Sequence, residues 1–334
     1  MLMSDVDCEN WRTMGKNTQA AREAARRSEC KNHLKQICLA ISNLESSKRA
    51  FPTGGALFNP QLELYLDSGG NPYGPDKQGL GWAYQILPYL EEGSTYSIKK
   101  QSDIQQIIVS TYNCPSRRAP TRNTSTDVDY AGAALFDYAS ATPWGVDRTT
   151  KLIPTINRNA FWQTFTTGRF AVPSNKDWLG IIARTPIWRD ENSGGSNPPF
   201  KDSGSTRPVA AAKVTDGLSK TMLIGEKAVN AKYYEGGSPS DDRGWSDGWD
   251  PDNIRCTCDP PVSDAQAANT QVLSEDWGQA FDVYNFGAAH TGGFNAAFGD
   301  GSVQTINYDV DPVLFNRIGD RRDGEAIDLS QISG

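Results

Sequence analysis

The sequence has only two histidines in 334 residues, His33 and His290. An active site needs an acid, a base or a nucleophile positioned together, and histidine often supplies one of these groups. Neither histidine of this sequence lies in a nucleophile-elbow motif or a metal-binding helix motif. A catalytic triad cannot be assembled around His290. We therefore expect a protein that is not an enzyme. Paired carboxylates among the 40 acidic residues are the catalytic alternative.

Long apolar runs and clustered basic residues are missing as well. No segment reaches the roughly 18 apolar residues of a membrane-spanning helix, so no membrane span is expected in this chain. Residues 1–16 read as an atypical polar leader, because Asp5, Asp7 and Glu9 stand where a signal peptide would be apolar. The net charge of −7 and the scattered basic residues argue against binding to nucleic acid.

The six cysteines support no metal site by their spacing. Cys256 and Cys258 are near neighbours, but no second pair with zinc-like spacing accompanies them, so a structural zinc site is not expected. Disulfides are reasonable if the protein is exported. Free, buried thiols are the alternative. Both alternatives stay open, since pairing cannot be read from sequence.

One long helix is predicted near the N-terminus. Residues 17–47 contain neither proline nor glycine, and Leu34, Ile37, Ile41 and Leu44 recur at spacings of three and four. This spacing places the four side chains on one face of an amphipathic helix over residues 17–48. The segment AFPTGG ends it.

The rest of the chain has the composition of an α+β protein with long ordered loops. The whole sequence is rich in glycine, proline and aromatic residues (31 Gly, 19 Pro, 9 Trp, 12 Tyr and 12 Phe), and most of them follow the predicted helix. We expect a globular domain over residues 49–328, with a short helix in 79–96, strands in 107–120, 129–135 and 220–228, a loop-rich insertion over about 138–208, and a flexible tail at 329–334.

A hairpin is predicted near the C-terminus. The runs GFNAAF and SVQTINYD are joined by Gly299-Asp300-Gly301, which predicts a turn with positive φ at Asp300 and Gly301. Gly292 and Gly293 would let the backbone pass close to a neighbour. His290 is expected to hold the loop before the hairpin through hydrogen bonds of its ring.

An acidic loop offers a candidate metal site. Asp247, Asp250 and Asp252 follow one another closely, and oxygen ligands at such spacing suit calcium, although the pattern is not an EF-hand. The alternative is a set of Asx turns and solvated carboxylates. Trp245 and Trp249 suggest a lid or a surface for stacking sugars.

Several segments together resemble a known family. QAAREAARRSECKNHLKQICLAISN, FPTGG, ILPYLEE, YNCPS, VTDGLSKTMLIGE, GWSDGWDPDNIRC and HTGGFNAAFGDGSV occur in the order of a pseudopilin-like family best represented in planctomycete-type bacteria. Its C-terminal signature, a prepilin-type processing-associated motif, is a histidine followed after nine residues by Asp-Gly. The positions that match this region are His290, Gly292, Gly293, Asn295, Asp300 and Gly301.

The resemblance implies a pilin-like fold, with a long N-terminal helix packed on an antiparallel sheet and large insertions. Family members typically begin with a processed apolar anchor, where this sequence is polar. The implied function is a structural subunit of a cell-surface or extracellular filament or secretion-type assembly. It would self-associate through the helix face of Leu34, Ile37, Ile41 and Leu44, or through the aromatic segment 158–170 with Phe161 and Trp162.

The alternative function is a secreted or surface module that binds a carbohydrate or another solute, with polysaccharide as the partner. Aromatic faces would supply contact and amides would supply specificity. Apart from calcium, no cofactor is expected.

Overall fold

The computed structural model describes residues 5–124, 131–144, 178–189, 198–202, 207–238, 240–269 and 284–332, with side chains from residue 18 onward. The predicted contact segment with Phe161 and Trp162 lies outside these residues. The α-helices are α1 (Asp5–Lys48), α2 (Trp82–Gln85), α3 (Gly93–Tyr96), α4 (Gln101–Ile104), α6 (Asp264–Ala267) and α7 (Pro312–Ile318). The strands are β1 (Tyr138–Thr142), β2 (Ile187–Arg189), β3 (Phe200–Asp202), β4 (Met222–Glu226), β5 (Ile254–Cys256), β6 (Gly293–Phe298) and β7 (Val303–Asn307).

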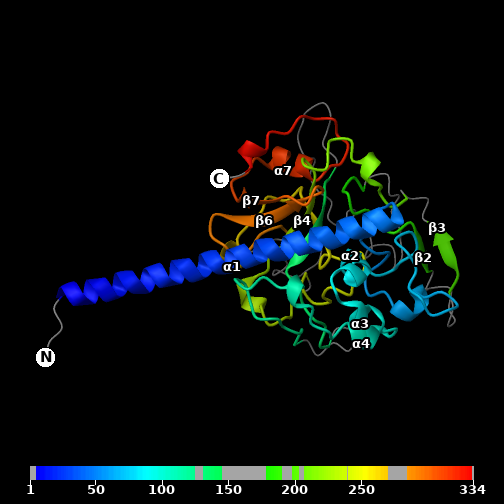
Figure 1. The fold of residues 1–334 in the computed structure, drawn as a ribbon, viewed down its shortest axis with the longest axis horizontal. Coiled ribbons are helices and arrows are strands. Elements are labelled where there is room, and N and C mark those ends of the chain that lie inside the picture. Colours follow the sequence, from blue (N-terminus) through cyan, green and yellow to red (C-terminus); the bar gives the residue numbers. More distant parts are fainter. Residues whose placement is uncertain are drawn as a thin grey trace.

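Helix α1 dominates the shape of the molecule. Its 44 residues correspond to about 66 Å, and it begins at Asp5, twelve residues before the predicted start at residue 17. The C-terminal half lies across a globular head, and the N-terminal half projects from it (Figure 1). The helix ends where Arg49 adopts a left-handed conformation with φ 59°, a common helix terminator. In the described part of the chain, no helix combines the length and hydropathy of a membrane span.

The predicted amphipathic face of α1 is confirmed. Leu34, Ile37, Ile41 and Leu44 are all buried in one apolar core with residues of the head. This packing corrects the prediction that the same four side chains also form a surface for self-association. Because the chain's own head covers them, they do not form an exposed assembly surface.

The main sheet has five strands in the order β5-β1-β4-β6-β7. The pairs β1–β4, β4–β6 and β6–β7 are antiparallel, but β5 pairs with β1 in parallel. The fold is therefore α+β with a mixed sheet, where an antiparallel one was expected. A separate two-stranded sheet joins β2 and β3.

Both faces of this sheet are covered. Phe294, Ala296 and Phe298 of β6 pack in a second apolar core with Phe315 of α7. Ala297 points the other way, into the core that contains α1. This alternation is the period of two expected for a strand, and it makes β6 the layer between the two cores.

The C-terminal hairpin forms as predicted, with one correction in its turn. Gly301 has φ +83° and donates its N–H to the Phe298 carbonyl, while Asp300 is not among the residues with positive φ. The turn therefore needs a left-handed residue only at Gly301, as in a type I turn followed by a glycine bulge. At Gly293, an added Cβ would lie 2.3 Å from the Ile306 carbonyl oxygen, which confirms the predicted close approach there. At Gly292 the prediction is wrong, because nothing lies within 4 Å of an added Cβ, and this glycine instead has φ +83°.

Several other predictions are corrected. The segment 107–120 contains only the 3-10 turn Ser110–Tyr112, and described residues 131–135 supply a single bridge from Ala134 to Arg122. The predicted insertion starts too early, because residues 138–142 form the interior strand β1. The tail is anchored through residue 332: Ile332 is buried, and its carbonyl accepts from the Asn307 N–H. The short helix α2 and strand β4 were predicted correctly.

Candidate functional site: the junction between helix α1 and the head

His290 lies at the point where α1 enters the head. Its Nδ1 is 3.0 Å from Glu23 Oε1 of α1, and its Nε2 is 3.2 Å from Glu226 Oε1 at the end of β4. The ring is buried, and both nitrogens face carboxylates. The predicted structural role is therefore the one its contacts support: His290 links the projecting helix to the sheet.

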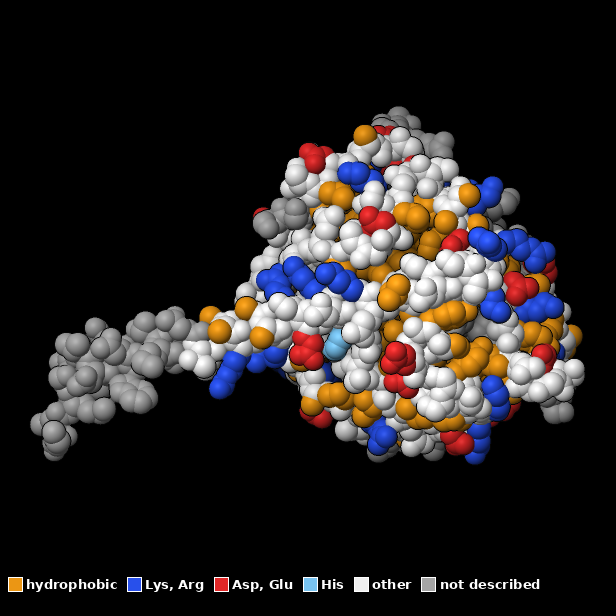
Figure 2. Space-filling view, in the orientation of Figure 1, with side chains coloured by type: hydrophobic (Ala, Val, Ile, Leu, Met, Phe, Trp, Pro, Cys, Tyr) orange, Lys and Arg blue, Asp and Glu red, His pale blue; other side chains and the backbone are white. Residues whose placement is uncertain are grey.

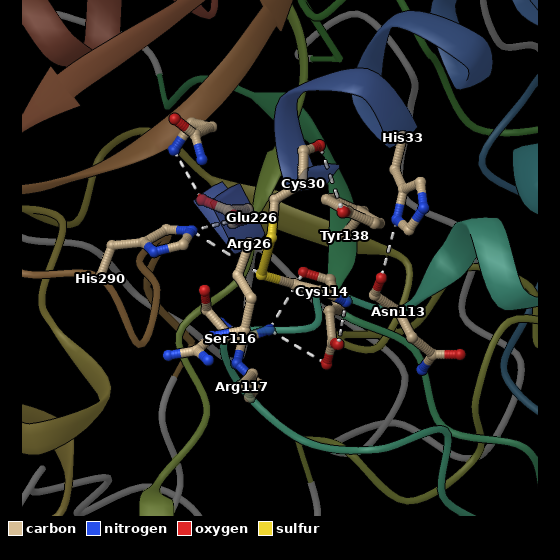
Figure 3. The surroundings of a disulfide bond; sticks show 12 residues. Arg26, Cys30, His33, Asn113, Cys114, Ser116, Arg117, Tyr138, Glu226 and His290 are labelled. Carbon is tan, nitrogen blue, oxygen red and sulfur yellow. Dashed lines mark hydrogen bonds and ion pairs between the residues drawn. A yellow bond between two sulfur atoms is a disulfide. The ribbon is translucent and has the colours of Figure 1, made fainter. Parts of the chain in front are cut away.

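A disulfide crosses the same boundary. Cys30 of α1 is bonded to Cys114 of the head, and the Cys114 sulfur lies 3.7 Å from His290 Nε2 (Figure 3). We call Glu23, Cys30, Cys114, Glu226 and His290 the helix–head junction. Its members come from α1, from two loops and from the end of β4.

Hydrogen bonds on either side of the disulfide extend this contact. Ser116 donates to Glu23 Oε1 at 2.9 Å, and Arg26 donates to Glu23 Oε2 at 2.7 Å. One turn past Cys30, His33 Nδ1 lies 2.9 Å from the Asn113 carbonyl, which can only accept, so this nitrogen carries the proton. The helix is thus held to the loop 113–116 over three of its turns.

The electrostatics of the junction favour a charged His290. Burial opposes protonation of the ring, but Glu226 and Glu23 outweigh it and raise the pKa of His290. Burial likewise disfavours ionisation of Glu23, but hydrogen bonds from Arg26, His290 and Ser116 lower its pKa. His290 thus faces the carboxyl groups of Glu23 and Glu226, which favour the charged form of its ring.

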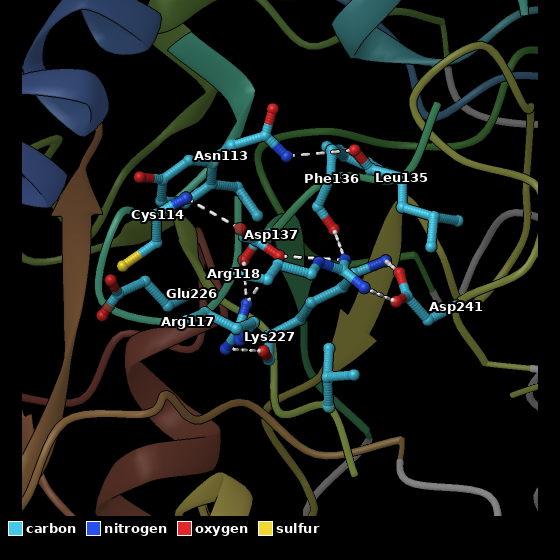
Figure 4. Close-up of polar contacts among 12 residues, drawn as sticks. Asn113, Cys114, Arg117, Arg118, Leu135, Phe136, Asp137, Glu226, Lys227 and Asp241 are labelled. Carbon is cyan, nitrogen blue, oxygen red and sulfur yellow. Dashed lines mark hydrogen bonds and ion pairs between the residues drawn. The ribbon is translucent and has the colours of Figure 1, made fainter. Parts of the chain in front are cut away.

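A buried ionic network lies next to Cys114 and Glu226 of the junction (Figure 4). Asp137 accepts from the Cys114 N–H at 2.7 Å and pairs with Arg117 at 3.1 Å and with Arg118 at 3.0 Å. These side chains are almost completely buried. Burial disfavours the charged Arg117, but Asp264 and Asp137 raise its pKa well above the usual value. The network continues through Asp241, Lys227, Asp252 and Asp264.

The other residues of the histidine to Asp-Gly motif build the hairpin beside α1. His290 precedes β6 and Asp300 follows it, so the nine-residue spacing is the length of a strand and its flanks. Asn295 donates its backbone N–H to Glu226 Oε2 at 2.7 Å, which fixes the carboxylate that faces His290. Asp300 accepts from the Ser302 N–H at 2.9 Å and stabilises the turn.

The predicted calcium ligands lie in a buried acidic cluster. The carboxylates of Asp250, Asp252 and Asp242, rather than Asp247, can bring oxygen atoms within 4.8 Å of one another. Asp247 instead accepts from the Gly248 N–H at 2.7 Å. Burial and neighbouring carboxylates raise the pKa of Asp242 to about 10. Because Lys227 pairs with Asp252 at 3.2 Å, part of the charge is already balanced, and calcium remains a prediction.

The two tryptophans of this region are not a lid or an exposed platform. Trp245 and Trp249 are each 1% exposed, and Trp245 donates from Nε1 to the Ile107 carbonyl at 2.8 Å. Both belong to the core that contains α1.

Comparison with known proteins places the chain in a family. Residues 19–313 match the family described as SBP_bac_10, protein of unknown function (DUF1559), and the chain belongs to it. No curated protein and no solved structure matches the chain.

Sequence reasoning located His290 but not its partners. Glu226 is the last residue of strand β4 and Lys227 follows it directly, and charges at the end of an apolar strand were the signal that a buried polar site lay nearby. Arg117 and Arg118 stand three and four residues after Cys114, which gave no such signal. The pairing of Cys30 with Cys114, 84 residues apart, had no local signature.

Proposed function

We propose that this chain is a structural subunit of a pseudopilin-like surface or extracellular assembly, in which the projecting half of α1 packs against neighbouring subunits. The observation that carries the proposal is the exposure of that half. Residues 18–22 are all exposed, and the first described side chains of α1 lie outside the rounded outline of the head (Figure 2). Contacts with the head begin at Glu23. A helix without tertiary contacts gains little stability in water.

The chemistry of the projecting segment suits packing between helices. Ala20, Ala21, Ala24 and Ala25 are exposed, and small side chains let two helix backbones approach closely. Between them lies the exposed Arg22, which can pair with an acidic residue of a neighbour. We therefore assign self-association to this alanine-rich surface, in place of the apolar stripe of α1 that the head covers.

The junction supports the same function. A subunit held by its helix transmits load to its head through the point where the two meet. In this chain, that point carries the Cys30–Cys114 disulfide and the His290 contacts to Glu23 and Glu226. A covalent link at this position keeps the head attached even when the apolar contacts of α1 are strained.

Assembly can be tested with charge substitutions on the exposed alanines. Ala20→Glu combined with Ala24→Glu keeps good helix formers but adds bulk and charge to the packing face. We expect wild-type protein to form ordered oligomers or filaments in electron micrographs. The variant should assemble only at a protein concentration at least about 10-fold higher, which corresponds to a loss of ~1.4 kcal/mol in the free energy of association. Asn43→Glu, at an exposed position where α1 lies on the head, is the control.

The result that would contradict the proposal is equally clear. Wild-type chains that stay monomeric in sedimentation velocity at all concentrations, or a double variant that assembles like Asn43→Glu, would remove the projecting helix as an assembly surface.

A second candidate function rests on a cavity of about 260 Å³ beside the end of α1. Its lining includes Tyr84, Tyr89, Tyr96 and Gln85, and the Tyr84 hydroxyl is buried without a hydrogen-bond partner. Aromatic faces with hydroxyl and amide groups suit a carbohydrate. Retardation of the wild-type chain, but not of Tyr89→Ala, in polysaccharide-containing gels would support this function; equal mobility of both in all gels would refute it.

A further inference from the structure

Four side chains with metal-binding atoms converge in the helix–head junction. The sulfur atoms of Cys30 and Cys114, a ring nitrogen of His290 and a carboxylate oxygen of Glu226 all lie within 4.8 Å of one another, and all four residues are buried. Each comes from a different part of the chain, on α1, before Ser116, at the end of β4 and before β6. In Figure 3 the histidine, the glutamate and the disulfide face one another.

We propose that the reduced chain binds one zinc ion here, with Cys30, Cys114, His290 and Glu226 as its four ligands. A dithiol reductant first cleaves the disulfide, supplying two electrons and two protons to give two thiols while it becomes a disulfide itself. Zinc then displaces one proton from each thiol, and the neutral His290 ring binds through Nε2. The same four residues thus serve two states, a disulfide when oxidised and a zinc centre when reduced.

The distances fit a tetrahedral centre. With ligands at about 2.0 to 2.3 Å from the metal, neighbouring ligand atoms lie roughly 3.3 to 3.8 Å apart. His290 Nε2 is 3.2 Å from Glu226 Oε1 and 3.7 Å from the Cys114 sulfur. All four ligand atoms lie within 4.8 Å of one another, and cleavage of the disulfide lets the two sulfurs separate to the spacing that a tetrahedral centre needs.

The surroundings already provide the outer contacts that such a site needs. Glu23 Oε1 lies 3.0 Å from His290 Nδ1, which fixes the tautomer with Nε2 free for a metal, as carboxylates beside zinc-bound histidines do. The Asn295 N–H holds the second oxygen of Glu226 at 2.7 Å. Arg27 and Lys31 of α1 interact electrostatically with His290 and Glu226, which offsets the excess negative charge of two thiolates and a carboxylate.

The ligand set selects zinc over the hard cation expected at the acidic cluster. Two thiolates and an imidazole are ligands that zinc prefers, whereas calcium and magnesium take oxygen. Cys256 and Cys258, the pair whose spacing attracts notice in the sequence, are bonded to each other and are not among these ligands.

Zinc binding is measurable on the full-length chain. A Cys256→Ser/Cys258→Ser variant, reduced with a phosphine and dialysed against buffered zinc, is expected to retain one zinc per chain, and its oxidised form none. Cys114→Ser in that background should weaken binding at least about 100-fold, and Glu23→Gln about 10-fold. Cobalt(II) in place of zinc should give thiolate charge-transfer absorption, and its intensity per bound cobalt should be about halved in Cys114→Ser, which keeps one of the two thiolates.

A second measurement needs no substitution at the ligands. X-ray absorption at the zinc edge of the reduced Cys256→Ser/Cys258→Ser chain should show two sulfur and two nitrogen or oxygen neighbours. A centre with oxygen and nitrogen neighbours alone, or a reduced chain that retains no zinc, would overturn the proposal. Because this test does not depend on oligomers, its outcome is separate from that of the assembly experiment.

Discussion

Cleavage of the Cys30–Cys114 disulfide should remove a large share of the stability of the fold. The bond closes a loop with a sequence separation of 84 residues, and chain entropy for such a loop amounts to about 4.5 kcal/mol at 25 °C. Domains of ordinary stability have about 5 to 15 kcal/mol in total. The reduced, metal-free chain should therefore stay folded but with a much smaller free energy of unfolding.

The experiment requires that only this disulfide respond. Cys256 and Cys258, two residues apart, form a second bond, so the Cys256→Ser/Cys258→Ser variant is the starting protein. Its free energy of unfolding is measured in guanidinium chloride with and without a phosphine reductant, in the presence of EDTA. We expect a decrease of about 3 to 5 kcal/mol on reduction.

A decrease below about 1 kcal/mol would refute the reasoning, because it would mean that the unfolded chain gains little freedom when the loop opens. Adding zinc in place of EDTA provides the complementary measurement. At a free concentration 100-fold above the dissociation constant, a site formed only in the folded chain restores about 2.7 kcal/mol.

Three further predictions concern the free energy of unfolding measured by denaturant titration. Leu34→Ala should lower it by about 2 to 5 kcal/mol, whereas Leu39→Ala on the same helix, 63% exposed, should change it by less than about 0.5 kcal/mol; equal effects would contradict the packing of α1. Gly301→Ala should cost about 1 kcal/mol, because φ is +83° there with open space around an added Cβ, and Gly93→Ala, with open space and no positive φ, should cost nothing. Burial, with nearby carboxylates, raises the pKa of Asp320 to about 6. The folded chain therefore binds the proton of the Asp320 carboxyl group more tightly than the unfolded chain does. The contribution of this proton to the free energy of unfolding is fully present below about pH 4 and is lost as the pH rises through 6. After allowance for its partial exposure, Asp320→Asn should add about 1 kcal/mol at pH 7.5 and nothing at pH 4, and an unchanged pH profile would count against this.

Local patterns predicted the parts of the fold that depend on local structure. The spacing of Leu34, Ile37 and Ile41 identified α1 and its buried face, and alternation around Asp300-Gly301 identified the β6–β7 hairpin. Strand β1 was missed because its sequence, YASAT, has small side chains and no alternation of apolar with polar residues. Its place between β5 and β4 is set by pairing with strands far along the chain, which no local pattern records.

The site was harder to predict, for a related reason. His290 stood out by rarity, but Glu23 and Glu226 lie 267 and 64 residues away from it in sequence. Acidic residues are common and usually solvated, so only the fold distinguishes these two. Cys30 and Cys114 could be paired only once α1 was known to lie beside the loop that precedes Ser116.

The apolar stripe and the junction contribute different properties to the docking of α1. Apolar contact is favourable but not directional, and Leu34, Ile37 and Ile41 repeat at spacings close to one helical turn. A helix that slid by one turn, about 5.4 Å, would therefore still bury apolar side chains. The same shift would break the bond from Cys30 to Cys114 and the 3.0 Å contact from Glu23 to His290, so the junction fixes the register. We accordingly expect reduction without metal to leave the far-ultraviolet circular dichroism unchanged while amide exchange of β4 and of residues 113–116 accelerates. Unchanged exchange would show that the apolar stripe alone is sufficient to hold the register.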